Sequence, residues 1–577
     1  MFDEIQITNK TMELKDCKDA WTFDEKNQCW CLEDILYTEK ATTPKFQRLS
    51  IFVPKSYMKE GGEIDPEGKM NGYTAKTVPV IFENNSAGYM QMPHTWLDGP
   101  RCYAHQYLKQ GYVYVTCGSR GHESKDADGK LCGKSPATLV DLKTGIRFIR
   151  HNKENIPGDM EKVISVGWSA GGAMSTLLAV TGNNASFTSY LEKNGAFMEE
   201  SDAVYAAQIY CPIIDLEHAD LAYEWLFAAD KENEASPAGP SGVMSPFEEA
   251  LSVKLKDAYV DYFNSLKLLN PDNGEILCLS ADGRSGSGYD YLMKKLNEAA
   301  STYLTKLKRG ELPEQYSPED YLCGNYTCKV PAPMGGPKEK DKDKADLMQG
   351  HAGPGVALHR PPMEAGMEKP GEQPSLGDMV SRPPKGVQHK AFEPPMMEVK
   401  GKDKSEWLSW DGNNAVIKDL DSYVLNHRRR MKPCTSFDVL KNESGENKVF
   451  GTPEQPKMHF NTAIAKAIQE LKEEFPEEYE KYYEAYAAVL DDKELERRVY
   501  LINPLNYIGT EEKSDSAKYC RIRVGASDAD TSFSVSMTLA LKLAQAGIST
   551  DYQLVWEQPH SEADYAGEVI EWIESIV

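Results

Sequence analysis

A serine at position 169 stands in a local sequence that is typical of a catalytic nucleophile. Residues 162–180 are KVISVGWSAGGAMSTLLAV, in which four strand-prone residues enter a glycine-rich turn and an Ala/Leu/Met run with helical character leaves it. A chain that passes directly from strand to helix holds the residue at the bend in a strained conformation, with its side chain exposed above the sheet. Gly167 and Gly171 are small, so the two backbones can pass closely there. We therefore predict that Ser169 is a nucleophile.

The G-x-S-x-G pattern by itself is a weak signal. At average glycine usage, and with serine assumed similar, it should occur by chance about once in five chains of this length. The inference depends on the flanks, because a β-branched strand precedes the turn, a small-residue helix follows it, and no charge lies within it. The alternative is an ordinary serine in a glycine-rich strand-to-helix turn.

Two further side chains are candidates to activate that serine. A serine hydroxyl needs a neighbouring imidazole to take its proton, and the imidazole needs a carboxylate to fix its tautomer. Of the 11 histidines, only His560 follows the last expected strand in a loop. Asp528 follows the strand before it and is the candidate acid. Asp530 is the alternative acid; otherwise it is a helix cap or a charge at a helix N-terminus.

Backbone N–H groups are the candidates to stabilise an oxyanion. The N–H group of Ala170, directly after the serine, is the expected donor. A second donor is expected from the loop after an early strand, and Gly88 in the turn 86–90 is the natural position for a close backbone approach. That loop has no HGGG pattern, so a simple glycine turn is the alternative for Gly88.

The elements that must position these residues alternate between strand and helix. Strands are expected at residues 49–53, 75–85, 112–116, 163–166, 204–214, 519–524 and 551–556. Helices are expected over 136–149, with Ser135 as the cap, and over 170–180, 532–546 and 565–576. This alternation is typical of an α/β protein with a doubly wound, mainly parallel sheet. With the chain order Ser, Asp, His, it predicts an α/β-hydrolase fold.

The alternation stops between residues 215 and 518. Helical stretches are expected at 246–269 and 461–498, and residues 330–404 between them are dense in Pro, Gly, Met and charge. Such a composition predicts a mobile or partly disordered loop, with a partner-binding surface as the alternative. We expect a first core part at 1–216, an inserted, mostly helical lid domain at 217–504, and a second core part at 505–577.

The composition disfavours several function classes. The 577 residues carry a net charge of −24 and 40% hydrophobic residues, and the isoelectric point near 5.0 disfavours nucleic-acid and membrane-surface partners. We see no signal peptide and no apolar window long enough for a membrane span. The 12 cysteines have no zinc spacing. We expect a cytoplasmic protein with no metal and no cofactor; secretion is the alternative if an export signal has been removed.

Four motifs resemble the bacterial tannases, or tannin acyl hydrolases. They are GWSAGG around Ser169, CPIIDLEHAD at 211–220, RVGASDADTS at 523–532 and WEQPHS at 556–561. The resemblance implies an α/β-hydrolase core with a large inserted lid, a triad of Ser169, Asp528 and His560, and a substrate-binding role for Asp530. The fungal tannase and feruloyl esterase family has cysteines beside the nucleophile and the histidine; here Trp168 and Pro559 exclude that subgroup.

The resemblance also implies residues that bind the substrate ring. Lys432 and Glu446, fourteen residues apart, correspond to a lysine and a glutamate that contact galloyl hydroxyls. Phenolic hydroxyls both donate and accept, so two carboxylates can accept from them while an ammonium donates. From the residues alone, Lys432 would belong to a solvated basic run at 428–430. Ile213 is implied as an apolar wall, although an isoleucine at a strand end is usually a core residue.

These observations favour a serine esterase that hydrolyses galloyl esters, with a small aromatic ester as its partner. The first alternative is an esterase for feruloyl or other hydroxycinnamoyl esters. A serine peptidase would need an added domain such as a propeller, and no repeat of that period is visible. The last alternative is a catalytically inactive hydrolase fold that binds through its Met/Pro-rich loop. The sequence does not predict the oligomeric state.

Overall fold

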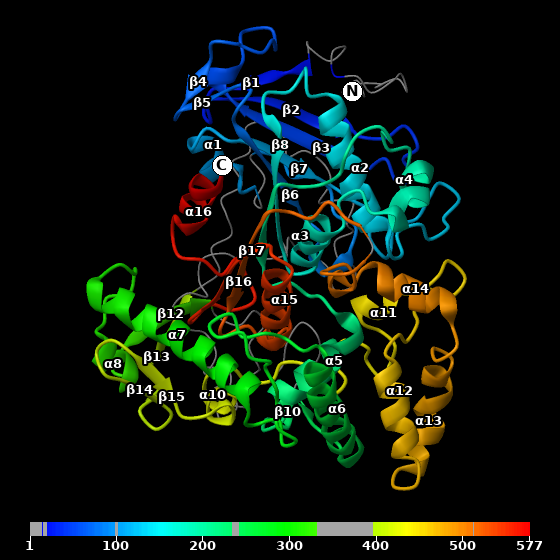
Figure 1. The fold of residues 1–577 in the computed structure, drawn as a ribbon, viewed down its shortest axis with the longest axis vertical. Coiled ribbons are helices and arrows are strands. Elements are labelled where there is room, and N and C mark those ends of the chain that lie inside the picture. The colour runs from blue at the N-terminus through cyan, green and yellow to red at the C-terminus, as the bar shows by residue number, and fades with distance from the viewer. Residues whose placement is uncertain (1–13, 15–19, 98–101, 234–241, 332–395, 512) are drawn as a thin grey trace.

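A nine-stranded sheet forms the centre of the protein in the computed structural model, which describes residues 14, 20–97, 102–233, 242–331, 396–511 and 513–577 (Figure 1). Its strand order is β1-β2-β3-β7-β6-β8-β9-β16-β17. The strands are β1 Thr22–Asp24, β2 Cys29–Leu36, β3 Arg48–Pro54, β6 Pro79–Asn84, β7 Val113–Cys117, β8 Asp159–Trp168, β9 Ala206–Tyr210, β16 Tyr519–Gly525 and β17 Ser549–Val555.

The six strands from β7 to β17 in this order are all parallel to one another. They are rich in Val, Ile and aromatic residues, and β6, β7 and β9 are buried along their whole length. Such continuous burial is what a sheet covered on both faces requires. The prediction of an α/β protein with a mainly parallel sheet is thus confirmed. The strands β1, β2 and β3 extend the sheet as an antiparallel edge.

Helices lie on both sides of this sheet (Figure 1). Helices α1 (Ala104–Lys109) and α16 (Glu568–Ile576) lie on one side, and α2 (Ala137–His151) and α3 (Ala170–Val180) lie on the other. The predicted Ser135 cap of α2 is wrong. The Ser135 hydroxyl donates instead to the carbonyl oxygen of Arg498, 363 residues along the chain, so a tertiary contact replaces the local cap.

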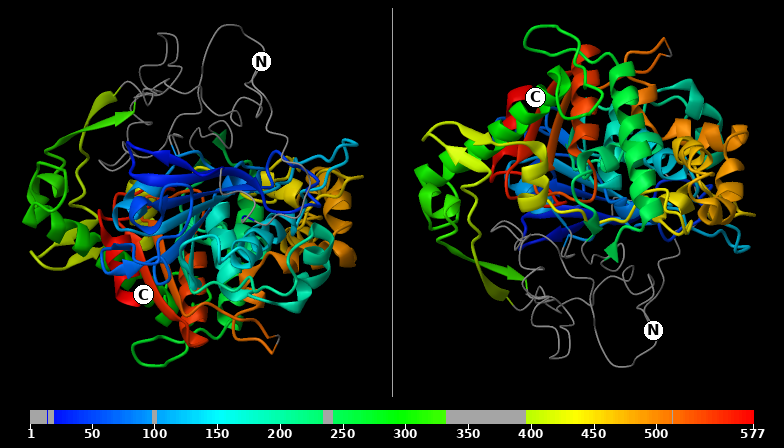
Figure 2. Two further views of the ribbon diagram at one scale, coloured as in Figure 1. Left: turned by 90° about the horizontal axis from the view of Figure 1, so that it is seen from above. Right: turned by 90° about the horizontal axis from the view of Figure 1, so that it is seen from below.

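The chain between β9 and β16 forms a largely helical region near the carboxyl ends of the parallel strands (Figures 1 and 2). The α-helices in its described residues are α5 Leu216–Leu226, α6 Pro246–Ser265, α7 Ser287–Arg309, α8 Pro318–Leu322, α10 Leu420–His427, α11 Gly445–Val449, α12 Thr462–Glu470, α13 Pro476–Ala487 and α14 Lys493–Leu501. A capping box between Ser245 and Glu248 begins α6 as its sequence favours. The expected helical stretch 461–498 is divided into α12, α13 and α14.

The Pro/Met-rich segment 330–404 is described only at its two ends. There β12 (Thr327–Pro331) pairs antiparallel with β13 (Met396–Lys400), whereas residues 332–395, on which the prediction of a mobile loop falls, lie outside the described residues. In the part of the chain that the structure describes, none of the helices has the length and apolar character of a membrane span.

Candidate active site

The turn between β8 and α3 holds Ser169 in a strained backbone conformation. Its φ of 57° and ψ of −126° lie in a region that residues with a Cβ atom rarely adopt. Two hydrogen bonds stabilise this conformation. The Ser169 N–H donates to the Tyr210 carbonyl oxygen (3.1 Å), and the Ser169 carbonyl accepts from the Ala173 N–H (3.0 Å). A Cβ atom at Gly167 would lie 2.3 Å from the Gly171 carbonyl oxygen. A glycine is therefore required at 167.

His560 lies between Ser169 and Asp528. Its Nε2 atom is 2.9 Å from the Ser169 Oγ atom, and its Nδ1 atom is 2.8 Å from Asp528 Oδ2. With a proton on Nδ1, the imidazole donates to the carboxylate and can accept the serine proton at Nε2. The Asp528 side chain is fully buried, and its other oxygen accepts from the Asp530 N–H at 2.8 Å. Asp528 is thus the carboxylate that hydrogen-bonds to the imidazole.

The electrostatic environment favours a proton on His560. Burial by itself lowers the pKa of this imidazole, but the negative charges of Asp528 and Asp530 raise the pKa of His560 well above its usual value. An imidazolium at this position is therefore stabilised. This is the property that a base needs if it is to hold a proton during a reaction.

The loops that carry Asp528 and His560 pass very close to each other at Gly525. A Cβ atom on Gly525 would lie 2.1 Å from the Gln558 carbonyl oxygen and 2.3 Å from that of Pro559. The Ser527 N–H donates to the same Gln558 carbonyl at 2.9 Å. Because backbone atoms cannot give way as a flexible side chain does, Gly525 sets the separation of the two loops.

Side chains from the helical region brace the loop that carries Asp528. Three fully buried residues donate hydrogen bonds to carbonyl oxygens of residues 526–531, namely Tyr223 to Ala529 (3.0 Å), Tyr423 to Ala526 and Arg428 to Thr531. None of the three was predicted as a site residue. Each of the three side chains lies more than a hundred residues from its partner in the sequence, so no local pattern indicates the contact.

A second group of buried side chains braces the loop that carries His560. The Tyr321 hydroxyl accepts from the Trp556 indole N–H at 2.8 Å and donates to the Glu557 carboxylate. The His427 ring stacks on Trp556, with ring centroids 4.2 Å apart. Burial raises the pKa of Glu557, while nearby Lys404 and the Tyr321 hydrogen bond lower it. These contacts fix the residues directly before His560.

The two predicted oxyanion donors occupy different elements. Ala170 is the first residue of α3, so its N–H group is at a helix N-terminus. Gly88 has a φ of 59° in the short helix η3 (Ala87–Tyr89). The neighbouring His122 supports η3, because its N–H donates to the Tyr89 carbonyl at 3.0 Å. Burial lowers the pKa of His122 to about 4, so it is neutral at neutral pH.

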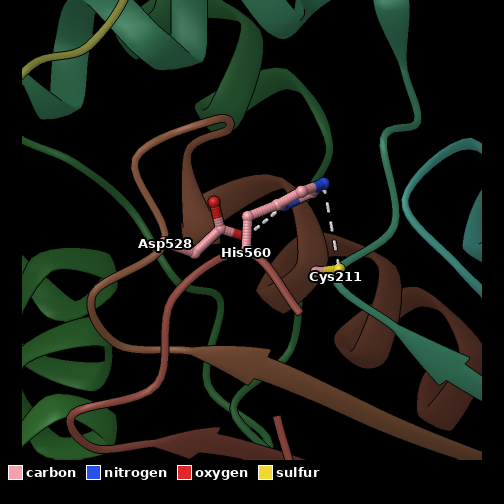
Figure 3. Close-up of side chains that lie close together, drawn as sticks. All are labelled: Cys211, Asp528 and His560. Carbon is pink, nitrogen blue, oxygen red and sulfur yellow. Dashed lines mark hydrogen bonds and ion pairs between the residues drawn. The ribbon is translucent and has the colours of Figure 1, made fainter. Parts of the chain in front are cut away.

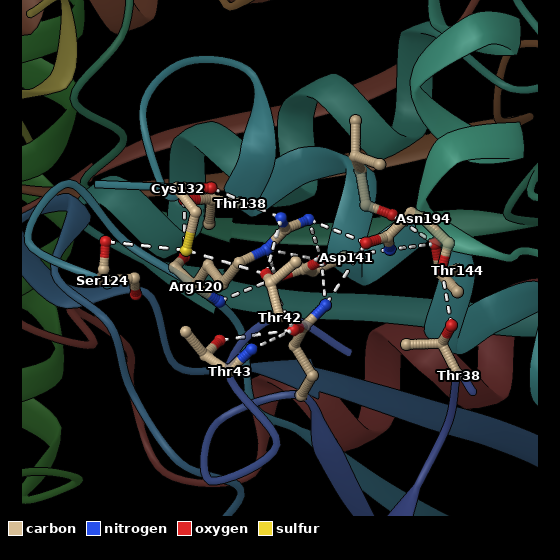
Figure 4. Close-up of polar contacts among 12 residues, drawn as sticks. Thr38, Thr42, Thr43, Arg120, Ser124, Cys132, Thr138, Asp141, Thr144 and Asn194 are labelled. Atoms are coloured by element: carbon tan, nitrogen blue, oxygen red, sulfur yellow. Dashed lines mark hydrogen bonds and ion pairs between the residues drawn. The ribbon is translucent and has the colours of Figure 1, made fainter. Parts of the chain in front are cut away.

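A buried polar network holds the segment that carries His122 (Figure 4). The Arg120 guanidinium donates to both carboxylate oxygens of Asp141 in α2, and to Asn194 at 2.8 Å. The Arg120 N–H also donates to Asp141, at 2.8 Å. The network therefore ties Arg120, which lies beyond β7 and two residues before His122, to α2.

The structure brings Lys432 and the Asp530 segment to a common partner. The Tyr223 hydroxyl accepts from the Lys432 N–H at 3.0 Å and donates to the carbonyl of Ala529, the neighbour of Asp530. The Lys432 ammonium lies 4.0 Å from the centre of the Phe437 ring. Lys432 and Asp530 are both partly exposed, so each retains access to a ligand.

Glu446 and Ile213 are linked through Tyr89. Burial, followed by the charge of Glu446, raises the pKa of Tyr89. The Tyr89 hydroxyl donates to the Ile213 carbonyl at 2.7 Å, and the Ile213 N–H donates to the Ser169 carbonyl at 3.2 Å. Ile213 is 6% exposed. The Glu446 segment thus lies beside η3, and Ile213 lies directly behind the serine turn.

The basic run 428–430 is not a solvated face, and that interpretation is wrong. Arg428 and Arg430 are fully buried. Arg430 pairs with the buried Glu224, and Arg429 pairs with Asp230 (Nε to Oδ2, 2.6 Å). Buried guanidinium groups with carboxylate partners are structural anchors. They hold the chain that leads into Lys432.

A comparison with models of protein families indicates the class of protein to which this chain is similar. The model of the BD-FAE family, a family of α/β-hydrolases, matches residues 74–237, which include β6, β7, β8, the serine turn and β9. The parallel sheet and the strand–turn–helix at Ser169 are those of an α/β-hydrolase. Among curated protein sequences, none matches the chain significantly.

Solved structures then narrow the comparison to bacterial tannases. The tannin acyl hydrolase from Lactobacillus plantarum is 28% identical, with a TM-score of 0.70 over 97% of each chain. A tannin acyl hydrolase in complex with ethyl gallate is also 28% identical, with a TM-score of 0.68 over 95% of this chain and 94% of that one. Fusobacterium nucleatum tannase is 26% identical, with a TM-score of 0.67 over 95% of each chain. The resemblance to bacterial tannases seen in the sequence is confirmed.

A Gly525→Ala variant tests the contact between the two loops. The added Cβ atom must push the Gln558 and Pro559 backbone away, so we expect the His560–Asp528 hydrogen bond to be lost and the protein to be destabilised by about 1–3 kcal/mol. Proton NMR measures the strongly downfield Nδ1–H signal of His560, and urea unfolding measures stability.

The matched control is Gly547→Ala, at a position where an added Cβ atom meets nothing within 4 Å. Its φ of 82° makes alanine strained there as well, so stability should fall while the downfield signal persists. An unchanged signal in Gly525→Ala would show that the close passage does not position the imidazole.

Proposed function

We propose that this protein is a serine esterase that hydrolyses galloyl esters and releases gallic acid. The observation that carries the proposal is the hydrogen-bonded series Ser169–His560–Asp528 in a chain whose fold is similar to bacterial tannases over nearly its whole length. The complex of one such tannase with ethyl gallate supports the choice of acyl group.

Ser169 attacks the ester carbonyl, and His560 takes the hydroxyl proton at Nε2. Asp528 holds the Nδ1 proton and stabilises the imidazolium that forms. The imidazolium then gives its proton to the leaving alcohol. A water molecule, deprotonated by the same nitrogen, releases the acid from Ser169 in the second half of the reaction.

The oxyanion that forms at the carbonyl is stabilised by backbone donors. The Ala170 N–H supplies one hydrogen bond, and its location at the start of α3 adds the favourable potential of a helix N-terminus. The Gly88 N–H supplies the second. Tyr89 of η3 contacts His122 and Ile213, and these contacts hold that loop against the serine turn.

Lys432, Glu446 and Asp530 bind the galloyl hydroxyls, and Ile213 packs against the ring. The ammonium donates and the two carboxylates accept, which matches a group whose hydroxyls do both. The Lys432 and Asp530 segments meet at Tyr223, and Glu446 lies near Tyr89. An acyl group that has no hydroxyls leaves these polar groups without partners, so it is disfavoured.

Residues 217–504 act as an inserted lid domain between core parts at 1–216 and 505–577. The helical region near the carboxyl ends of the parallel strands (Figure 1) carries Lys432 and Glu446, while the core carries Ser169, Asp528 and His560. The substrate is therefore held between the two. The lid contributes Lys432 and Glu446 to specificity, and the core contributes the chemistry together with Asp530 and Ile213.

Hydrolysis of methyl gallate, measured as release of gallic acid, tests the function directly. Ser169→Ala should lower kcat on the order of 10⁶-fold because no nucleophile remains. Ser575→Ala, at an exposed serine in α16, is the matched control and should leave the rate unchanged.

If Ser169→Ala retains full activity, the serine mechanism is wrong. If neither the native protein nor any variant turns over any ester, the inactive binding fold is correct. A clear preference for methyl ferulate would replace the galloyl assignment by a hydroxycinnamoyl one.

Selectivity between acyl groups tests the ring-binding residues. Glu446→Gln and Lys432→Met should each lower kcat/KM for methyl gallate by about 10- to 100-fold while changing that for methyl benzoate much less, because benzoate makes no hydroxyl contacts. The exposed neighbour Glu443 supplies the control Glu443→Gln. Equal losses on both esters would instead indicate a structural role for Lys432 and Glu446.

The pH profile tests the protonation state of His560. The imidazole accepts a proton only when neutral, and its pKa is raised above 6.5, so kcat/KM should fall on the acid side with an inflection above pH 6.5. Asp530 contributes to this rise in pKa, and Asp530→Asn should therefore move the inflection to lower pH. An inflection well below 6.5 in the native protein would contradict the assignment of His560 as the base.

A further inference from the structure

A thiol lies beside the same nitrogen of His560 that faces Ser169. The Cys211 Sγ atom is 4.0 Å from His560 Nε2. One potential ligand atom from each of Cys211, Asp528 and His560 lies within 4.8 Å of the other two. Figure 3 shows His560 between the carboxylate of Asp528 and the sulfur of Cys211. Neither the motif analysis nor the proposed reaction gives this cysteine a role.

The backbone holds Cys211 firmly in place. The residue directly follows β9, has a φ of 34°, and its N–H donates to the Arg523 carbonyl at 2.8 Å. The side chain is buried, whereas 14% of the His560 side chain is exposed. The backbone that carries the sulfur is therefore fixed, and the imidazole beside it is partly exposed to solvent.

The separation of the two atoms suits a bridging metal ion. Zinc bonds of roughly 2.3 Å to sulfur and 2.0–2.1 Å to nitrogen place the two ligand atoms about 3.6 Å apart at a tetrahedral angle and about 4.4 Å apart in line. The observed 4.0 Å lies between these limits. One ion can bind both atoms without a shift of the backbone.

We propose that Cys211 and His560 form a site for a thiophilic divalent cation such as Zn²⁺ or Cd²⁺. The ion bonds to the Cys211 sulfur, whose proton is released to solvent, and to the lone pair of His560 Nε2. Asp528 accepts the hydrogen bond from Nδ1–H and so orients the ligand imidazole, as a carboxylate beside a metal-binding histidine does. Water and the Ser169 hydroxyl, 2.9 Å from Nε2, complete the coordination.

Occupation of this site excludes general-base chemistry at His560. The Nε2 lone pair that bonds to the metal is the one that takes the serine proton, so binding and turnover are mutually exclusive. This inhibition rests on the proposed function, whereas metal binding itself does not. One sulfur and one imidazole select thiophilic ions over Mg²⁺ and Ca²⁺, which prefer oxygen ligands.

Direct binding is measured with Cd²⁺ on the full-length Ser169→Ala protein, which keeps Cys211 and His560 and in which water replaces the Ser169 hydroxyl as a ligand. Calorimetry gives the affinity, and ultraviolet absorption reports the sulfur-to-cadmium charge transfer. Adding Cys211→Ser should remove one charge-transfer contribution and weaken binding at this site at least tenfold. Adding Cys278→Ser, at an exposed cysteine, should change neither. Equal cadmium binding with and without Cys211 overturns the site.

Inhibition is measured as the ratio of methyl gallate turnover with and without Zn²⁺ for each variant. The Zn²⁺ concentration that gives half-inhibition should rise at least tenfold in Cys211→Ser and remain unchanged in Cys278→Ser. A chelator should reverse the inhibition. Mg²⁺ at the same concentration should not inhibit. Equal zinc sensitivity of the native and Cys211→Ser proteins would refute the inhibitory role.

A third measurement does not depend on a variant that folds. In the native protein, Cd²⁺ should protect Cys211 from alkylation, as read by peptide mass spectrometry, while Mg²⁺ should not. Loss of ester hydrolysis in every assay would refute the proposed function but leave the cadmium binding and protection results interpretable. Alkylation of Cys211 that Cd²⁺ does not slow would overturn the site.

Discussion

The close passage of two backbones at Gly525 is the constraint on which the site depends. The acid and the imidazole come from loops after different strands, and a hydrogen bond of 2.8 Å between Asp528 and His560 tolerates little variation in their separation. The parallel sheet brings both loops to one edge, but only the missing side chain at 525 lets the Gln558 and Pro559 carbonyls approach so closely. The relay to Ser169 follows from that contact.

The three members of this relay are held in different ways. The serine turn is held by the neighbouring strand and by its own helix, since its hydrogen bonds join Ser169 to β9 and to the first turn of α3. The Asp528 and His560 loops instead depend on buried side chains from residues 217–504, including Tyr223, Tyr321 and Tyr423. The helical region is therefore part of the framework of the site, and not only a cover over it.

The sequence predicts those features whose causes are local. Strand periodicity and glycine positions predicted the sheet, and chain order placed Ser169, Asp528 and His560 in the loops that the structure brings together. Long-range contacts have no such signal. Arg429 and Arg430 look solvated because their carboxylate partners, Asp230 and Glu224, lie about two hundred residues earlier. Ser135 looked like a helix cap for the same reason, since its partner is Arg498.

The Nε2 atom of His560 faces both the Ser169 oxygen and the Cys211 sulfur. The proposed reaction requires that the serine, and not the thiol, gives its proton to this nitrogen. Burial raises the pKa of the Cys211 thiol, an effect that His560 only partly opposes. The sulfur therefore stays protonated at neutral pH and does not compete with Ser169 for the proton acceptor. A thiolate would pair with an imidazolium and leave the serine without a base. In the proposed reaction, the burial of Cys211 thus leaves the serine as the nucleophile, and the proposed metal ion, by displacing the thiol proton, would remove that protection.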